Sequence, residues 1–364
     1  MIEGRVSAPP GTDRFRGRGG EIVDFILRNV EQHPGDIVRL ATGRFGLSRQ
    51  MVNRYVQRLV EAGYLEREGE TRSRRYALRC IVDFRHTLPV DKDITEDEVW
   101  REYVVPHLTG LPRNVLQICQ YGFTEMFNNV IEHSEADRAK LLVQMDAVKV
   151  RLMVFDYGIG IFNKLARDRH ITDSTVALME LLKGKLTTAP SGHSGQGIFF
   201  TSKMFDCFML SSGRLRLLHV MDGEPRVEVE ERRSDSRGTT VGMQIGVDSP
   251  RTWTGVFDRF SAADLEGFSR THLYVKLSGY RGEGLVSRSQ ARKLVARLEE
   301  FEEVVLDFQD VEAIGQAFAD EVFRVFHANH PTVRLVWRNT NHEIDRMIQW
   351  VGGGGSVEQP RLPL

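Results

Sequence analysis

The sequence predicts an α+β multidomain protein, because three regions of the chain differ in their apolar patterns. Residues 20–80 read as three helices followed by two short strands, and residues 100–245 as a long helix, strands and glycine-rich turns. Residues 270–350 alternate between strands and helices. With 364 residues, the chain is long enough for two or three domains of roughly 100–200 residues each. Each region is therefore expected to have its own core.

The composition is that of an ordinary globular protein, with 41% hydrophobic and 27% charged residues. The net charge of −1 argues against the whole molecule being an electrostatic binder of nucleic acid. Residues 1–80 differ from this average, since they contain fifteen arginines, no lysine and ten acidic residues, a local net charge of +5. This local excess can face a polyanion.

The cysteines and the apolar runs predict a cytoplasmic protein with no membrane partner. Cys80, Cys119 and Cys207 are odd in number, far apart and not spaced as metal ligands, which favours a reducing cytosol. The chain has no run of 18 or more apolar residues and no apolar signal segment after its first residue.

The two ends of the chain are left out of the fold prediction. The opening MIEGR resembles a protease-site remnant, so residues 1–18 are expected to be disordered or foreign to the native chain. The glycine-rich residues 352–364 are predicted to form a flexible tail.

Residues 19–80 predict a three-helix domain that ends in a β-hairpin. A first helix is expected to end before Pro34, and the stretch GDIVRLATGRFG predicts a short second helix closed by a turn at Phe45-Gly46. Ser48 is the predicted N-cap of the third helix. The stretch YLEREGETRSRRYAL reads as a strand, a polar turn and a second strand. The third helix has an apolar stripe at helical spacing, formed by Met51, Val52, Tyr55, Val56, Leu59 and Val60.

Three helices followed by a β-wing resemble a winged helix-turn-helix. In that fold the third helix enters the major groove of double-stranded DNA, and the wing contacts phosphates. The alternative interpretation is a solvated face on a small domain that docks to proteins. The DNA contacts implied by the resemblance are Ser48, Arg49, Gln50, Asn53 and Arg54 on the third helix, and Arg72, Arg74 and Arg75 on the wing.

The stretch YGFTEMFNNVIEHS (121–134) predicts a helix with a buried side and a polar row. Glu125, Asn129 and His133 are each one turn apart, so they lie on one face. The oxygen of an Asn can ligate Mg²⁺, and a Glu can orient or deprotonate an attacking hydroxyl or water. The same row would also suit the outer face of an amphipathic helix.

Three glycine-containing boxes follow this helix. Asp156 ends a predicted strand next to Gly158 and Gly160, where its carboxylate can accept a hydrogen bond from an exocyclic amine beside a flat ring. The stretch SGHSGQGIFF (191–200) has three glycines before an apolar run, and its backbone amides and the start of a helix favour a phosphate. The stretch SRGTTVGMQI (236–245) leads Gly238-Thr239 into an alternating strand.

The order of these boxes, Glu-x-x-x-Asn, Asp-x-Gly-x-Gly, Gly-x-x-Gly-x-Gly and Gly-Thr, resembles the GHKL ATPase superfamily. This superfamily includes gyrase, the ninety-kilodalton heat-shock chaperones, mismatch-repair ATPases, histidine kinases and anti-sigma-factor serine kinases. The resemblance places a GHKL ATP-binding domain at residues 95–248, an α/β sandwich with helices on one face of a mixed sheet. The stretch EMFNNVIEH looks most similar to the anti-sigma serine-kinase branch.

The resemblance implies ATP and Mg²⁺ as cofactors and gives each box a role. Asn129 would hold Mg²⁺, Glu125 would be the general base, and Asp156 would bind the adenine amino group. Thr239 would support Asp156, and the segment between Asp156 and the glycine-rich loop would be a movable lid. The other ATP-binding residues that the resemblance implies are His133, Gly158, Gly160, Gly192, Ser194, Gly195, Gln196 and Gly197.

Residues 265–348 predict a third domain in which strands and helices alternate. The stretch VVLDFQDVEAIGQAFADEVF is similar to STAS domains, the anti-sigma antagonists that serine kinases phosphorylate. The phosphoacceptor Ser of that family is missing, since Ile314-Gly315-Gln316-Ala317 stands at the corresponding turn. The family's phosphorylation switch is therefore in doubt, and a docking or sensing module is the simpler interpretation.

Two functions remain open at this point. The first is a regulator in which ATP binding gates DNA binding, with the STAS-like domain controlling the lid or a partner protein. The second is a serine/threonine kinase or ATPase that acts on another protein. The sequence leaves a homodimer open.

Overall fold

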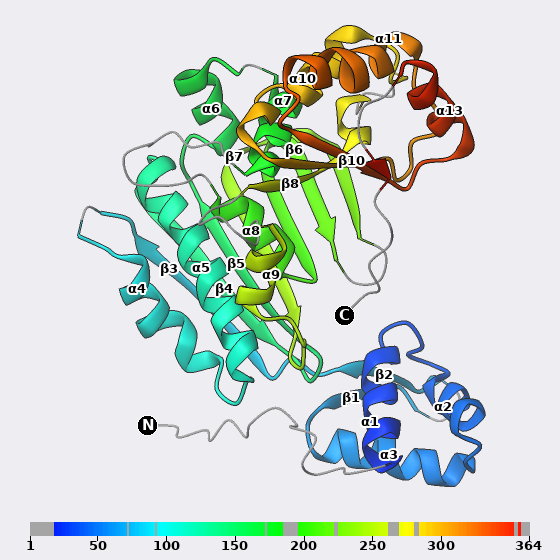
Figure 1. Ribbon diagram of the computed structural model, residues 1–364. Coiled ribbons are helices and arrows are strands. Elements are labelled where there is room, and N and C mark those ends of the chain that lie inside the picture. Colours follow the sequence, from blue (N-terminus) through cyan, green and yellow to red (C-terminus); the bar gives the residue numbers. More distant parts are fainter. Residues whose placement is uncertain are drawn as a thin grey trace.

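The computed structural model describes residues 18–70, 73–91, 93–171, 173–184, 196–221, 225–260, 269–279, 284–352 and 356–357. A small N-terminal helical domain lies at one end of a central sheet, and a C-terminal α/β domain lies near the other end (Figure 1). The predicted α+β multidomain organisation is confirmed.

The N-terminal domain has three helices and a two-stranded antiparallel wing, as predicted. Gly46 ends the second helix with φ +64°, a left-handed conformation that glycine adopts without strain. Ser48 caps the third helix, and its Oγ accepts a hydrogen bond from the Met51 N–H at 3.2 Å. Met51 itself is 45% exposed, so its predicted place in the apolar stripe is wrong. The elements are α1 (Arg18–Asn29), α2 (Ile37–Phe45), α3 (Arg49–Glu61), β1 (Leu65–Glu68) and β2 (Arg75–Leu78).

The central sheet has five strands in the order β3-β4-β5-β7-β6, and every neighbouring pair is antiparallel. The prediction of a mixed sheet is therefore wrong for the described strands. A short turn joins β4 to β5, and strands joined in this way pair antiparallel without the crossover that a parallel pair needs. The strands are β3 (Val82–Pro89), β4 (Arg138–Met145), β5 (Lys149–Asp156), β6 (Cys207–Val220) and β7 (Arg226–Gly246).

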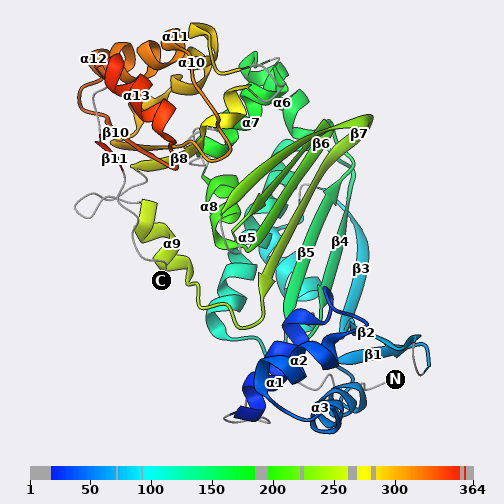
Figure 2. The same cartoon turned by 90° about the vertical axis from the view of Figure 1, so that its right-hand side faces the viewer.

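Helices α5 and α8 cover one face of this sheet, as Figure 2 shows. They pack closely, because a Cβ added at Gly122 of α5 would collide with the Phe205 ring that follows α8. Within the described ranges, no helix has the length and apolar character needed to cross a membrane. The helices of this region are α4 (Glu96–Val99), the π-helix Trp100–Val104, the 3-10 turn Val105–His107, α5 (Arg113–His133), α6 (Ile161–Arg169), α7 (Ser174–Lys183), α8 (Gly197–Met204) and α9 (Trp253–Phe260).

The C-terminal domain contains a parallel sheet in the order β11-β10-β9-β8. The strand predicted from Thr271 ends at Tyr274 and continues as a 3-10 helix. The elements are β8 (Arg270–Tyr274), the 3-10 helix η5 (Val275–Gly279), α10 (Arg288–Val295), the 3-10 turn Leu298–Glu300, β9 (Glu303–Asp307), α11 (Gln316–Ala319), the π-helix Asp320–Phe326, α12 (His327–Asn329), β10 (Arg334–Arg338), α13 (His342–Trp350) and β11 (Ser356–Val357).

Two sheets extend beyond the predicted domain limits. Strand β3 lies before residue 95 yet pairs with β4 along its whole length, so the central sheet begins at Val82. Strand β11 lies inside the predicted tail, where it pairs with β10. In both cases the sheet's boundary is set by backbone hydrogen bonds to a strand that is distant in sequence. The expectation for residues 1–17 lies outside the described residues.

The N-terminal domain is attached to the turn between β4 and β5 and to the segment after β7. Lys149 forms an ion pair with Glu31, and Arg28 donates a hydrogen bond to Asp248 at 2.5 Å. Ala147 of the β4–β5 turn is part of the N-terminal domain's core. The winged helix is thus anchored at the end of the sheet where β5 begins.

Candidate functional site

Asp156 lies at the end of β5 and is only 7% exposed. Its Oδ1 accepts a hydrogen bond from the Gly158 N–H at 2.9 Å. Burial raises the pKa of the Asp156 carboxyl, while hydrogen bonds from Gly158 and Thr239 oppose this change. The Thr239 hydroxyl also accepts a hydrogen bond from the Ile161 N–H at 3.1 Å. The two residues that the sequence predicts to act together, Asp156 and Thr239, are therefore in contact.

Two close backbone approaches around Asp156 require glycine. A Cβ at Gly158 would collide with the Ser134 carbonyl oxygen at the end of α5, and a Cβ at Gly238 would collide with the Asp156 carbonyl. Gly238 also has φ +77°, which disfavours any side chain. The glycines thus bring the ends of β5 and α5 against β7.

Glu125 of α5 lies against the first residue of α8. A Cβ at Gly197 would collide with Glu125 Oε2, so only a glycine leaves room for the carboxylate there. Gln196 is the N-cap of α8, and the free N–H groups of this helix start favour an anion. The structure therefore joins the predicted Glu-x-x-x-Asn box to the end of the glycine-rich loop. Gly192, Ser194 and Gly195 lie outside the described residues.

Asn129 and His133 follow Glu125 on α5, and both are half-buried. Glu132 lies 3.7 Å from His133 Nε2. The three predicted residues of this helix share one face, as the spacing requires. Among the described residues, Asn129 makes no side-chain hydrogen bond.

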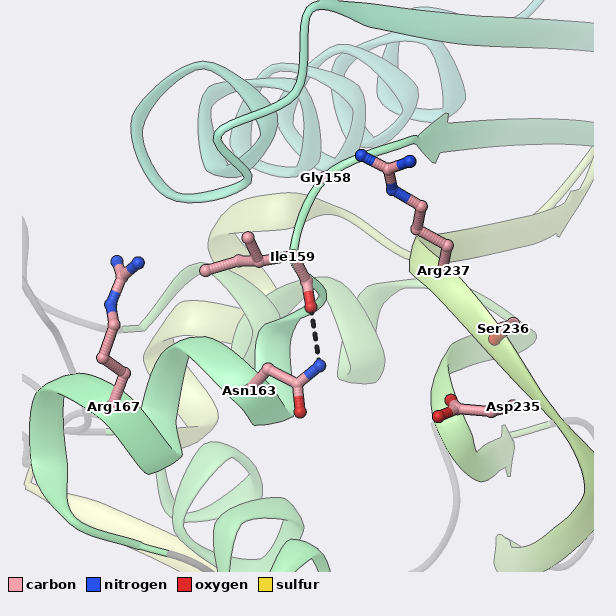
Figure 3. Close-up of a pocket in the computed structure, with 7 residues that line it drawn as sticks. All are labelled: Gly158, Ile159, Asn163, Arg167, Asp235, Ser236 and Arg237. Atoms are coloured by element: carbon pink, nitrogen blue, oxygen red, sulfur yellow. Dashed lines mark hydrogen bonds between the residues drawn. The ribbon is translucent and has the colours of Figure 1, made fainter.

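A pocket of about 620 Å³ lies beside the Asp156 loop (Figure 3). The Asn163 amide donates a hydrogen bond to the Ile159 carbonyl at 2.8 Å, and Arg167 and Arg237 lie on either side of it in Figure 3. Sequence reasoning missed these residues, because they belong to no box of the predicted pattern. The pocket is lined by Gly158, Ile159, Asn163, Arg167, Asp235, Ser236 and Arg237.

The predicted DNA-contacting residues lie on the surface of the N-terminal domain. Arg49, Gln50, Asn53 and Arg54 are exposed on α3. Ser48 is exposed too, and while its oxygen accepts the capping hydrogen bond, its hydroxyl can still donate its proton to a phosphate. Arg74 and Arg75 are exposed at the start of β2, and Arg72 lies outside the described residues.

A buried polar cluster that the sequence did not reveal joins α8 to the C-terminal sheet. Lys203 Nζ lies 3.4 Å from His272 Nδ1, and His272 Nε2 lies 3.0 Å from Asp307 Oδ2. Arg338 also pairs with Asp307 at 2.9 Å. Burial lowers the pKa of Lys203 to about 7 and that of His272 to about 3. A lysine inside the apolar run GIFFTSKMF was the available signal.

The Lys203 ammonium should make the folded protein less stable as pH falls. The unfolded chain keeps this proton up to a pH of about 10.4, whereas the folded protein releases it near pH 7. Because the unfolded state binds more protons within that window, stability rises with pH there. Between about pH 7 and 9, the free energy of unfolding should rise by about 2 kcal/mol more in the wild type than in Lys203→Met. Urea unfolding over a pH series measures this, with Lys276→Met as the control. Equal pH dependence in Lys203→Met and the wild type would contradict the assignment.

Comparisons with known protein families match both ends of the chain. Residues 25–75 match the MarR family, and residues 290–345 match a family described as a STAS-like domain of unknown function (DUF4325). Neither match includes the central sheet. No curated protein matches the chain. The chain thus carries a MarR-type winged-helix domain and a C-terminal STAS-like domain. The MarR-type domain points to transcriptional control and to DNA as a partner.

Proposed function

We propose that this protein is a Mg·ATP-binding regulator of the GHKL superfamily that couples its nucleotide state to DNA binding. The observation that carries the proposal is the position of Asp156, a buried carboxylate at a strand end beside Gly158, Gly238 and Thr239. A carboxylate in such a place accepts a hydrogen bond from an exocyclic amine while the neighbouring backbone leaves room for a flat ring.

The neighbourhood of Glu125 supports the phosphate half of the proposed site. Gly197 lets the Glu125 carboxylate lie against the start of α8. The free N–H groups of this helix start favour a negatively charged group. Asn129 would hold Mg²⁺ through its amide oxygen, one turn from Glu125. When bound, the metal neutralises charge on the phosphates. His133 completes the same face.

The DNA half of the proposal rests on the exposed face of α3 and on the wing. Arg49 and Arg54 are exposed on a helix whose opposite side forms the domain core. In this geometry, Gln50 and Asn53 would read base edges, and the arginines would contact phosphates.

Calorimetric titration of the full chain with ATP and Mg²⁺ tests the nucleotide proposal. We expect saturable binding of one ATP per chain in the presence of Mg²⁺ and weaker binding with EDTA. A promoter-fragment library titrated with and without Mg·ATP then tests the coupling. No heat of binding at millimolar ATP would refute the nucleotide assignment, and equal DNA affinity in both conditions would refute the coupling.

A second candidate function is a serine/threonine protein kinase or an ATPase that acts on another protein. The position of Glu125 against Gly197 favours it, because a general base has to lie near the phosphate-binding loop. The STAS-like domain lacks a Ser at the corresponding turn, so a phosphoacceptor would belong to a partner protein.

Replacing Glu125 by alanine should lower phosphate release or transfer by about 10²–10⁴-fold, the usual contribution of a general base. ATP affinity should change far less, since the group acts on the chemical step. Turnover assays alongside calorimetry measure both quantities, with Glu132→Ala of the same helix as the control. A wild type without turnover, with or without candidate protein substrates, would refute the enzyme alternative.

A further inference from the structure

Helix α7 lies between the proposed nucleotide site and the STAS-like domain. At its start, Ser174 and Thr175 line a pocket of about 210 Å³ together with residues of α6 and β6. This pocket shares Asn163 and Asp235 with the larger pocket beside Asp156. At its other end, α7 packs against β8 and η5 of the C-terminal domain. It also lies within the segment that the sequence predicts to move.

Lys183, the last residue of α7, is buried at the end of α10. Its Nζ donates hydrogen bonds to the Ala296 carbonyl at 2.6 Å and to Glu180 Oε1 at 2.5 Å, and lies 3.5 Å from the Lys293 carbonyl. Only 2% of Lys183 is exposed. The last carbonyls of a helix have no partner within the helix and carry its negative partial charge, so an ammonium is a favourable cap there.

Three further contacts hold α7 to the same domain. The Thr271 hydroxyl donates a hydrogen bond to the Lys183 carbonyl at 3.0 Å. Lys293 pairs with Asp173, the N-cap of α7, at 3.1 Å. Arg297 lies 3.6 Å from Glu180, whose side chain is 5% exposed. Both ends of α7 are therefore bonded to the last turn of α10 and the two residues that follow it.

The buried Glu180–Lys183 pair ties the position of α7 to that of α10. A buried charge without its partner is strongly destabilising. The free energy of the folded state would therefore rise steeply if Lys183 stayed buried but lost Glu180 and the α10 carbonyls. Burial lowers the pKa of Lys183, and the charge of Glu180 opposes this change. If α7 moved away from α10, these groups would have to be exposed to water together.

We propose that the STAS-like domain clamps α7 within the same chain, and that the strength of this clamp sets how fast nucleotide enters and leaves. This inference rests on the proposed function. Helix α7 packs against α6, whose Ile161 N–H donates a hydrogen bond to the Thr239 hydroxyl. Restraining α7 therefore restrains α6, which is bonded to Thr239 at the proposed nucleotide site.

The double variant Glu180→Leu with Lys183→Met tests the clamp in the full chain. Replacing a buried ion pair by apolar residues of similar size generally preserves the fold, so the variant removes the polar attachment without leaving an unpaired charge. Amide exchange in residues 174–183 should accelerate by about tenfold or more, because the α10 carbonyls lose their donor. Dissociation of a fluorescent ATP analogue, followed by stopped flow, should accelerate to a similar extent. Arg324→Met, which breaks an exposed pair with Asp320 in the same domain, is the matched control.

The two measurements separate the possible failures. Unchanged amide exchange in α7 would overturn the clamp. Faster amide exchange with unchanged analogue dissociation would overturn its control of nucleotide access. If the wild type binds no ATP analogue, the proposed function fails, and amide exchange alone then decides whether the STAS-like domain holds α7.

Discussion

Replacing Asp156 by asparagine should strongly weaken Mg·ATP binding while the protein stays folded. The carboxylate is 7% exposed and accepts hydrogen bonds from Gly158 and Thr239. In the proposed site it would also accept a hydrogen bond from the adenine amine. An asparagine at this position would place an amide donor against the adenine amine. Hydrogen bonds to charged groups contribute about 1.5–3 kcal/mol, so losing this one should lower the affinity by about 10- to 150-fold, and the contact between two donors adds to the loss.

Asn129→Ala should lower the affinity in the presence of Mg²⁺ to a similar extent, because it removes the proposed metal ligand. Calorimetry measures both variants, and thermal unfolding shows that they remain folded. Asp146→Asn is a matched control, since Asp146 is also buried and accepts the Val148 and Lys149 N–H groups at the opposite end of β5. If Asp156→Asn and Asn129→Ala both bind ATP with wild-type affinity, the nucleotide assignment is wrong.

The joint replacement of Arg74 and Arg75 by alanine should weaken DNA binding and flatten its dependence on salt. Each phosphate contact adds about 0.9 to the slope of log affinity against log salt, so two contacts account for about two units. Both arginines are exposed at the start of β2, on the wing of a domain with a local excess of positive charge. The loss should be similar for all sequences, because phosphates carry no sequence information.

Fluorescence anisotropy of the full chain on random and genomic duplexes over a salt series measures this slope. The control removes two exposed arginines of β6, Arg214 and Arg216, which lie in the central sheet. Gln50→Ala and Asn53→Ala should instead relax sequence preference with little change in slope. A wild type that binds no duplex at low salt would exclude the DNA interpretation and leave the winged helix as a protein-docking module.

Local patterns predicted those parts of the molecule that local interactions determine. The cap at Ser48, the turn at Gly46 and the hairpin of the wing depend on residues within a few positions of each other, and all three are confirmed. The contact between Asp156 and Thr239 spans 83 positions, and it was predicted only because the order of the boxes resembles a known superfamily. The nucleotide role of these residues stays a prediction.

The features that the sequence did not predict depend on contacts between distant elements. Lys203 and His272 are 69 positions apart, and Lys183 and Ala296 are 113 positions apart. In sequence each is a single polar residue within or beside an apolar stretch, a pattern that does not identify its partner. The antiparallel sheet was missed for a similar reason, since strand direction is set by which strands become neighbours.

Strand β5 has a consequence for communication along the molecule. Its first residue, Lys149, is paired with Glu31 of the winged helix, and its last residue is Asp156. Eight residues at about 3.3 Å each make a rod of roughly 25 Å between the two ends. Because β5 is bonded to a neighbour on both sides, a slip by one residue would turn its buried side chains outward. A conformational change at Asp156 can therefore reach Lys149 only as a tilt or twist of the whole sheet. Such a tilt would change the orientation of the winged helix, which is attached at the Lys149 end of β5.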